Sequence, residues 1–150
     1  MRLTLFSGVY MITYKFFNHL PPEAVSIRQT VFVAEQGFHN EFDDIDERAL
    51  HLIVYADGKA VGNLRAFADD TALGTYIIGR LAVLKEYRRF HLGQKLMLAV
   101  EAEIKRLGGT KIMLSAQCQA QKFYEKLGYT ASGAVYLDEH CPHIHMEKNI

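Results

Sequence analysis

Apolar and β-branched residues gather in short segments along the first third of the chain. The run from residue 11 to residue 17 predicts a strand. Pro21-Pro22 then favours the first turn of a helix, and Gly37 supplies a stop. Between them, apolar residues recur at helical spacing at Ala24, Ile27, Val31 and Ala34. This part of the chain therefore predicts one strand followed by one helix.

The next segments predict a hairpin followed by a buried strand. Residues 51–56 and 59–67 are strand-like in composition, and Asp57-Gly58 between them is a strong two-residue hairpin turn. Residues 76–83 are mostly apolar and rich in branched side chains, so we expect a central strand that is covered on both faces. The acidic and aromatic segment 38–47 has no clear period and is predicted to be a surface loop or short helix.

Helical and strand-like patterns alternate in the last third of the chain. Gly108-Gly109 ends a predicted helix whose apolar face is Leu92, Leu96, Ala99, Val100, Ile104 and Leu107. Residues 111–114 predict a short strand, residues 120–127 a helix that Gly128 stops, and residues 129–148 one or two further strands. The order of elements predicts an α/β sandwich with a mixed sheet and flanking helices.

Length, charge and cysteine content limit the expected number of domains, the partners and the cellular compartment. The 150 residues, 49% of them hydrophobic, suit a single domain over 1–150. The 17 basic and 17 acidic side chains cancel, so neither nucleic acid nor a membrane is expected as a partner. Two cysteines are too few for a disulfide framework, which favours a cytoplasmic protein. Residues 1–10 lack a signal-peptide pattern and are either an N-terminal extension or part of the fold.

A basic turn between the predicted central strand and the next helix is suited to hold an anion. Residues 86–93 include Arg88 and Arg89, and Gly93 lets the backbone approach a ligand closely. Exposed N–H groups and the helix dipole would face a pyrophosphate here. Basic residues before a helix are also common in solvated turns, so this segment alone leaves both interpretations open.

Two motifs in this region resemble the GNAT superfamily of acetyltransferases. The first, Arg80-Leu-Ala-Val and then Tyr87-Arg88-x-x-His91-x-Gly93, resembles the acetyl-CoA turn Arg/Gln-x-x-Gly-x-Gly/Ala. The sequence departs from this pattern at His91, where the first glycine is usual. The second, Ser115-Ala-Gln117-x-x-Ala120-x-x-Phe123-Tyr124-x-x-Leu127-Gly128-Tyr129, is similar to the segment Asn-x-x-Ala-x-x-Leu-Tyr-x-x-x-Gly-Phe. Two motifs in this order are more specific than either alone.

Further segments resemble the ElaA/YjcF-like branch of the superfamily. They are Arg28-x-x-Val-Phe-Val-x-Glu35-Gln36, the acidic loop ending near Asp46, His51, Ser115-Ala-Gln117 and Pro142-His143-Ile-x-Met146. The C-terminal segment is also similar to the tail of glyphosate N-acetyltransferase, whose histidine there is the catalytic base. The resemblance implies the GNAT fold, a mixed and mostly antiparallel central sheet flanked by helices, with residues 80–83 splayed from the neighbouring strand.

The resemblance also implies acetyl-CoA as the acetyl donor and assigns residues to it. These are Leu81, Ala82, Val83, Arg88, Arg89, His91, Leu92, Gly93, Gln94, Gln117, Gln121 and Phe123. Tyr124 is predicted to be the general acid, because a phenol is protonated at neutral pH and matches a thiolate in basicity. The alternative is that Tyr124 only fills the core beside Phe123.

A base is needed because an alkyl ammonium is almost wholly charged at neutral pH. His143 is the predicted base, since histidine titrates near neutrality, and the alternative is a structural histidine on a strand. Glu35 is a rival base or an acceptor-binding residue. Carboxylates of the acidic loop are further rivals, or attract a cationic acceptor, or are simply solvated: Glu41, Asp43 and Asp46.

Three arginines are candidates for binding a carboxylate of the acceptor. Arg28, Arg65 and Arg80 can each do so by bidentate contacts, or can be held in internal ion pairs. Arg28 and Arg80 are the better candidates because both fall in the segments that resemble the family.

These observations predict an N-acetyltransferase that moves acetyl from acetyl-CoA to a primary amine by direct attack in a ternary complex. The expected acceptor is a small molecule, and homodimers are common among relatives. One alternative is a catalytically silent acyl-CoA-binding or interaction module, which His91 favours. Another is a metal cluster, although the spacing matches no closed zinc pattern and no metal is predicted: His140, Cys141, His143 and His145.

Overall fold

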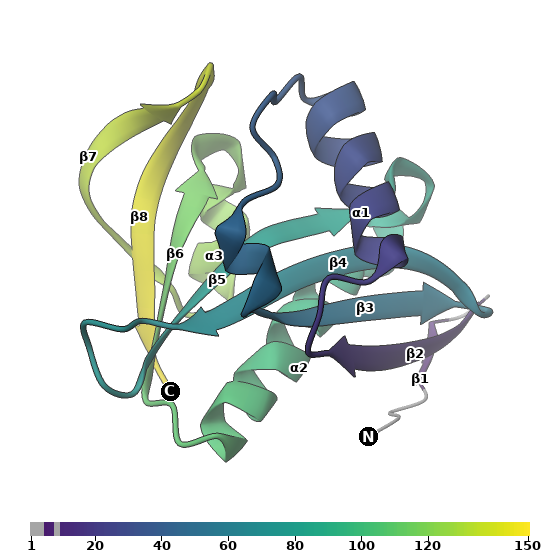
Figure 1. The fold of residues 1–150 in the computed structure, drawn as a ribbon, viewed down its shortest axis with the longest axis horizontal. Coiled ribbons are helices and arrows are strands. Elements are labelled where there is room, and N and C mark those ends of the chain that lie inside the picture. The colour runs from purple at the N-terminus through teal and green to yellow at the C-terminus, as the bar shows by residue number, and fades with distance from the viewer. Residues whose placement is uncertain (1–4, 8–9) are drawn as a thin grey trace.

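The computed structural model of the chain describes residues 5–7 and 10–150, which form one eight-stranded sheet in the order β1-β2-β3-β4-β5-β6-β8-β7 (Figure 1). Neighbouring strands are antiparallel except β5 and β6, which are parallel. The strands are β1 (Leu5–Ser7), β2 (Tyr10–Phe17), β3 (Leu50–Ala56), β4 (Lys59–Ala68), β5 (Thr75–Val83), β6 (Lys111–Gln117), β7 (Thr130–Asp138) and β8 (Cys141–Asn149). The mixed, mostly antiparallel sheet predicted from the sequence is confirmed.

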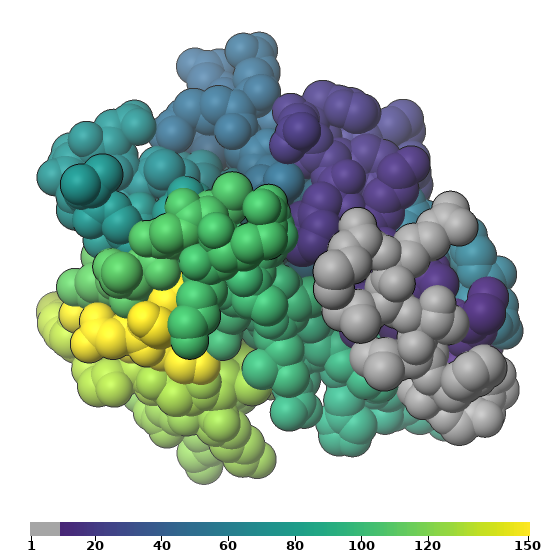
Figure 2. Space-filling view, turned by 90° about the horizontal axis from the view of Figure 1, so that it is seen from below, coloured from purple at the N-terminus to yellow at the C-terminus, as the bar shows by residue number. Residues whose placement is uncertain are grey.

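Helices cover both faces of the sheet. They are α1 (Pro22–Arg28), the π-helical η1 (Gln29–Glu35), the 3-10 helices η2 (Asp44–Glu47), η3 (Lys85–Phe90) and η4 (Cys118–Ala120), and the α-helices α2 (Leu92–Arg106) and α3 (Gln121–Lys126). Figure 1 shows α1 in front of the sheet and α2 behind it. Seen from below, the green atoms of the α2 region lie between the yellow C-terminal strand and the purple N-terminal part (Figure 2). No helix of the described residues is long and apolar enough to cross a membrane.

The larger core lies between the sheet and α2. Leu96, Met97 and Val100 of α2 are fully buried against side chains of β3 and β4, among them Leu52 and Leu64. The amphipathic spacing read from the sequence is therefore the packing face of this helix. A smaller core lies beneath α1 and η1 on the other face, where Ile27, Val31, Phe32 and Phe38 pack together with Ala82.

The predicted elements are present, with shifted boundaries. The hairpin turn has left-handed backbone at both central positions, with φ of 48° at Asp57 and 82° at Gly58, as a type I′ turn requires. The short strand predicted at 111–114 continues to Gln117, and the helix predicted over 120–127 begins with the 3-10 turn η4. Within the predicted N-terminal extension, β1 pairs with β2, whereas residues 1–4, 8 and 9 lie outside the described residues.

The sheet opens in its middle, where β5 and β6 diverge. Their pairing covers four residues and ends at Ile78 opposite Leu114. The register between β4 and β5 then shifts near Asn63, and Arg80 adopts a left-handed φ of 59°. A bulge of this kind bends a strand and re-aims its side chains. The splaying of residues 80–83 that the resemblance implied is thus observed, and it leaves an opening between β5 and β6.

Candidate active site

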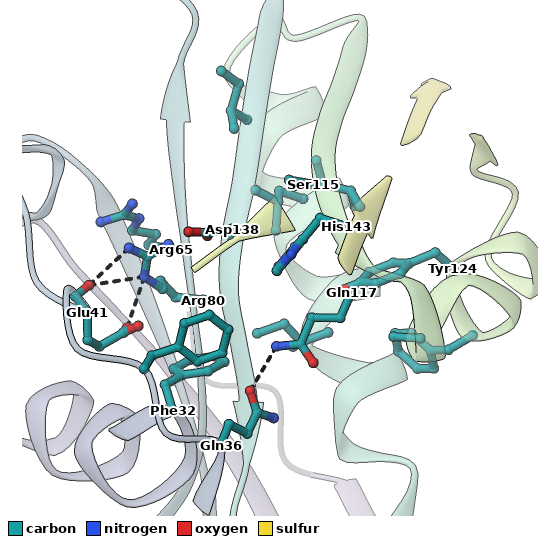
Figure 3. Close-up of a pocket in the computed structure, with 18 of the residues that line it drawn as sticks. Phe32, Gln36, Glu41, Arg65, Arg80, Ser115, Gln117, Tyr124, Asp138 and His143 are labelled. Atoms are coloured by element: carbon teal, nitrogen blue, oxygen red, sulfur yellow. Dashed lines mark hydrogen bonds and ion pairs between the residues drawn. The ribbon is translucent and has the colours of Figure 1, made fainter. Parts of the chain in front are cut away.

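A cavity of about 350 Å³ fills the opening between β5 and β6 (Figure 3). Its wall combines side chains from β5, β6, α3, β7, β8 and the segment after η1. The polar residues that carry its chemistry are Arg80, Ser115, Gln117, Tyr124, Asp138 and His143. Because these residues come from distant parts of the sequence, the cavity exists only once the sheet has formed.

A second cavity of about 610 Å³ adjoins the first on the side of α2. Leu81 of β5 and Phe123 of α3 line both cavities, so the two cavities adjoin at these side chains, and we refer to the pair as the channel. Polar and basic groups gather in the second cavity: Arg88, His91, Gln94 and Lys126. A long ligand with an anionic end can therefore lie with that end at the second cavity and its other end in the first.

The turn before α2 has the geometry expected of an anion site. The 3-10 helix η3 ends at His91, which has φ 57° and ψ 29°, and α2 begins at Leu92. Only glycine adopts this left-handed conformation freely, although histidine is several-fold enriched there over most residues. The family's preference for glycine at this position follows from this φ, and the exposed His91 side chain lines the second cavity.

Arg88 is held in place rather than free. Its Nε donates to the carbonyl oxygen of Val83 at 2.9 Å, and its two terminal nitrogens donate to Glu35 at 2.6 and 2.7 Å. The hydrogen bonds from Arg88 lower the pKa of Glu35. Glu35 lines neither cavity and is held as the ionised partner of Arg88, which corrects the prediction that it binds the acceptor or acts as the base.

Most of the side chains assigned to acetyl-CoA line the two cavities: Leu81, Val83, Arg88, His91, Gly93, Gln94, Gln117 and Phe123. Four others do not line either cavity with their side chains, and their assignment to acetyl-CoA stays a prediction. Ala82 and Leu92 are buried in the two cores. Gln121 donates to Glu125 at 2.9 Å, and the guanidinium of Arg89 lies 5.3 Å from the ring centre of Phe90.

Tyr124 lies in the first cavity, close to where the two cavities meet. It follows Phe123 in α3, and its partly buried ring lies 5.0 Å from that of Phe123 and 6.0 Å from that of Tyr129. Burial raises the pKa of the Tyr124 phenol, so the hydroxyl keeps its proton at neutral pH. Tyr124 thus packs against aromatic neighbours and also lines the cavity as a proton donor.

His143 lies in the same cavity and has a defined tautomer. Its side chain is only 6% exposed, and Nδ1 lies 2.8 Å from the carbonyl oxygen of Cys141. A carbonyl oxygen only accepts hydrogen bonds, so Nδ1 carries the proton of the neutral ring and Nε2 keeps its lone pair. The ring packs between Phe38 and Tyr136, at centroid distances of 6.4 and 6.1 Å. His143 therefore has the geometry of a general base.

The structure also brings into the cavity wall residues to which the sequence assigned no role, among them Gln36, Ser115 and Asp138. Gln117 of β6 donates to Gln36 at 2.8 Å and so joins two walls of the cavity. The hydroxyl of Ser115 is hydrogen-bonded to that of Tyr136. Asp138, the last residue of β7, also lines the cavity. An acid within a segment predicted only as one or two strands has no feature that singles it out from one sequence.

The acidic segment is not a solvated loop, because two of its carboxylates are buried against Arg28. This guanidinium is fully buried, and it donates to Glu41 Oε2 at 2.8 Å and to Asp46 at 2.7 and 3.1 Å. Glu41 and Asp46 are 5% and 3% exposed. Arg28 lines neither cavity, so the structure corrects its prediction as a substrate-binding residue and shows an internal ion pair instead.

The other two arginines belong to the same cluster. Arg65 donates to Asp43 at 2.6 Å and to Asp46 at 2.8 Å. Arg80 lines the first cavity, but its Nε lies 2.9 Å from Glu41 Oε2 and its Nη2 lies 3.4 Å from Asp43. Figure 3 shows Arg65, Arg80 and Glu41 together on one side of the cavity, opposite Tyr124. We call Arg28, Arg65, Arg80, Glu41, Asp43 and Asp46 the ion cluster.

Two further histidines, His51 and His145, have structural contacts. His51 is fully buried, and its Nε2 lies 2.9 Å from the carbonyl oxygen of Asp46. His145 pairs with Glu147 at 3.0 Å. Within residues 5–7 and 10–150, no three side chains of the types that bind metals converge on one point, so the alternative of a metal cluster gains no support.

Comparison with known proteins agrees with this geometry. The family described as "Acetyltransferase (GNAT) domain" matches residues 18–150, and the chain belongs to this family. It is 35% identical to YjcF of Bacillus subtilis, an uncharacterized N-acetyltransferase, over 85% of this chain and 91% of that protein. The structure of Escherichia coli ElaA has a TM-score of 0.82 and 26% identity, covering 92% and 99% of the two chains. An acyl-CoA N-acyltransferase from Pseudomonas aeruginosa has a TM-score of 0.81 and 30% identity, covering 91% and 99%.

Proposed function

We propose that the protein is an N-acetyltransferase that transfers acetyl from acetyl-CoA directly to an amine in a ternary complex. The observation that carries this proposal is the pair of adjoining cavities, one lined by Tyr124 and His143 and the other by residues of the basic turn. The P. aeruginosa relative, named for N-acyl transfer from acyl-CoA, supports the same class of reaction. The two cysteines are free thiols, which suits a cytoplasmic location.

The second cavity suits the diphosphate of the donor. Arg88, His91 and Lys126 supply positive charge or hydrogen-bond donors there, and the first N–H groups of α2 have no partner within their own helix. The acyl arm would then follow the edge of β5 past Leu81 and Phe123 into the first cavity. The β6-facing edge of β5 after Ile78 pairs with no described strand, so its main-chain groups are open to the arm.

The chemistry needs one base and one acid, and both lie at the far end of this channel. His143 Nε2 takes a proton from the acceptor ammonium, so that the neutral amine attacks the thioester carbon. A C–N bond forms, the C–S bond breaks, and the leaving thiolate takes the proton of the Tyr124 hydroxyl. The attacking nitrogen then releases its second proton, which restores the Tyr124 hydroxyl, and protonated His143 returns its proton to solvent. General acid and general base catalysis each contribute about 10²- to 10⁴-fold to a rate.

A second candidate is a silent acyl-CoA-binding module, which His91 favours. Its side chain lies in the second cavity where the family pattern has glycine, and it reduces the room for a diphosphate. In that case the protein would bind acetyl-CoA or CoA without consuming the thioester.

The test is release of CoA from acetyl-CoA in the presence of a panel of amines. We expect turnover with at least one amine, and Tyr124→Phe should lower kcat by about 10²- to 10⁴-fold while the fold is unchanged. Tyr55→Phe is the matched control, because that hydroxyl donates to Glu23 outside both cavities. Binding of acetyl-CoA without CoA release on any amine would reject the proposal in favour of the silent module.

A further inference from the structure

The charges around the first cavity do not cancel. The ion cluster holds three arginines and three carboxylates, and every member is paired within it. Asp138 is the only other carboxylate of the cavity wall, and it makes no ion pair with any described residue. With the arginines neutralised, the acceptor end of the cavity carries one unbalanced negative charge.

Asp138 is held at the rim of the cavity by the residue that follows it. Glu139 has a left-handed φ of 53°, and its carboxylate accepts the N–H groups of His39 and Asn40 at 2.8 and 3.0 Å. These bonds tie the tip of the β7–β8 hairpin to the segment that carries Asn40, another residue of the cavity wall. The exposed side chain of Asp138 therefore lies at the rim of the cavity, on the side of Arg65 and Arg80 (Figure 3).

The strand register sets the separation between Asp138 and the predicted base. On β8, Cys141 lies opposite Asp138 and His143 lies opposite Tyr136, so Asp138 and His143 are diagonal neighbours on one face. Diagonal pairs of this kind are about 7–8 Å apart. Two nitrogens that contact these side chains at the same time would be separated by a distance on the order of 7 Å.

We propose that the acceptor is a small dication, an amine that carries a second basic nitrogen on the order of 7 Å from the first. The first nitrogen lies at His143 and is acetylated, and the second stays protonated and pairs with Asp138. This inference rests on the proposed function and specifies its substrate class. Asp138, rather than the acidic segment 38–47, is then the residue that attracts a cationic acceptor. The carboxylates Glu41, Asp43 and Asp46 of that segment are already paired with arginines.

The test uses three acceptors of equal chain length that differ only at the distal end: 1,5-diaminopentane, pentylamine and 5-aminopentanoate. In the parent protein we expect kcat/KM to be highest for the diamine, about two- to fivefold above pentylamine, which corresponds to about 0.5–1 kcal/mol for an exposed ion pair. The value for 5-aminopentanoate should be the lowest, because its carboxylate would face Asp138.

The variant Asp138→Asn should lower kcat/KM for the diamine to the value for pentylamine and leave pentylamine unchanged. Asp44→Asn is the matched control, because it removes the same charge from an exposed carboxylate outside the cavity and should change neither value. Equal values for diamine and monoamine in the parent, an equal loss for both in Asp138→Asn, or a preference for 5-aminopentanoate would each overturn the inference. Failure of every amine to release CoA would instead reject the proposed function.

Discussion

Asp46 joins two of the buried arginines, so neutralising it measures how much the ion cluster stabilises the fold. It is 3% exposed and accepts hydrogen bonds from Arg28 at 2.7 and 3.1 Å, from Arg65 at 2.8 Å and from the N–H of Asp43 at 3.2 Å. Burial alone would raise the pKa of Asp46, but the hydrogen bonds from Arg28 and Arg65 lower it from 3.8 to about 2. Asp46→Asn keeps the shape of the side chain and removes its charge.

The magnitude follows from this pKa. The lowered pKa of Asp46 corresponds to about 2 kcal/mol of folding free energy, at about 1.4 kcal/mol per pKa unit. Breaking a buried ion pair costs about 3–5 kcal/mol when a charge is left behind, but Arg28 and Arg65 keep other carboxylate partners. We therefore expect Asp46→Asn to lower the free energy of unfolding at pH 7 by about 2–4 kcal/mol, and Tm by on the order of 10 °C.

The lowered pKa of Asp46 determines how the stability difference between parent and Asp46→Asn changes with pH. A carboxylate with a lowered folded-state pKa stabilises the protein fully above its unfolded pKa, and the contribution is lost as pH falls from about 4 towards 2. Roughly half, about 1 kcal/mol, should be gone at pH 3. The stability difference between parent and Asp46→Asn should therefore shrink by that amount between pH 7 and pH 3. Burial raises the pKa of Glu41, but that effect is common to both proteins and largely cancels in the difference.

Urea unfolding followed by circular dichroism at pH 7, 5, 4 and 3 measures the difference directly. Asp44→Asn, an exposed neighbour in the same 3-10 helix, is the control and should change stability by less than about 0.5 kcal/mol. The reasoning would be refuted if Asp46→Asn were as stable as the parent at pH 7, or if the difference were the same at pH 7 and pH 3.

Two further predictions concern the base and the donor site. His143→Gln should lower kcat by about 10²- to 10⁴-fold and flatten the acidic limb of the pH profile of kcat/KM, and an unchanged limb would show that another group is the base. Arg88→Ala should raise the KM for acetyl-CoA by about tenfold with a smaller change in kcat, since Arg88 lines the second cavity. Glu35→Gln frees Arg88 from its paired carboxylate and should not raise that KM, whereas an unaltered KM in Arg88→Ala would remove Arg88 from the donor site.

The elements of the fold could be predicted from the sequence because each has a local signal. The hairpin at Asp57-Gly58 needs two left-handed residues and has a pair that adopts this conformation readily. The apolar face of α2 repeats over four turns of helix. Family motifs placed Tyr124 and His143 in the site, and both line the same cavity.

The sequence could not predict which charged side chains form buried ion pairs, because their partners are distant in the sequence. Five acids within residues 41–47 look like a solvated loop, yet Glu41 pairs with Arg28 and Asp43 pairs with Arg65. Neither pair has a periodic signature, since each forms only when the segment folds over the sheet. Asp138 was not indicated for the complementary reason, because the role proposed for it depends on its making no ion pair with any described residue.

The ion cluster also stabilises the divergence of β5 from β6. Arg80 has a left-handed φ of 59° at the bulge where β5 leaves β6, a conformation that costs about 1–3 kcal/mol for a residue other than glycine. Its carbonyl oxygen accepts a hydrogen bond from Asn63 at 3.0 Å, and its guanidinium is held by Glu41 at 2.9 Å. Contacts on both its main chain and its side chain therefore offset the strain. The same pairing that neutralises the arginines holds β5 apart from β6, and so stabilises the cavity that Tyr124 and His143 line.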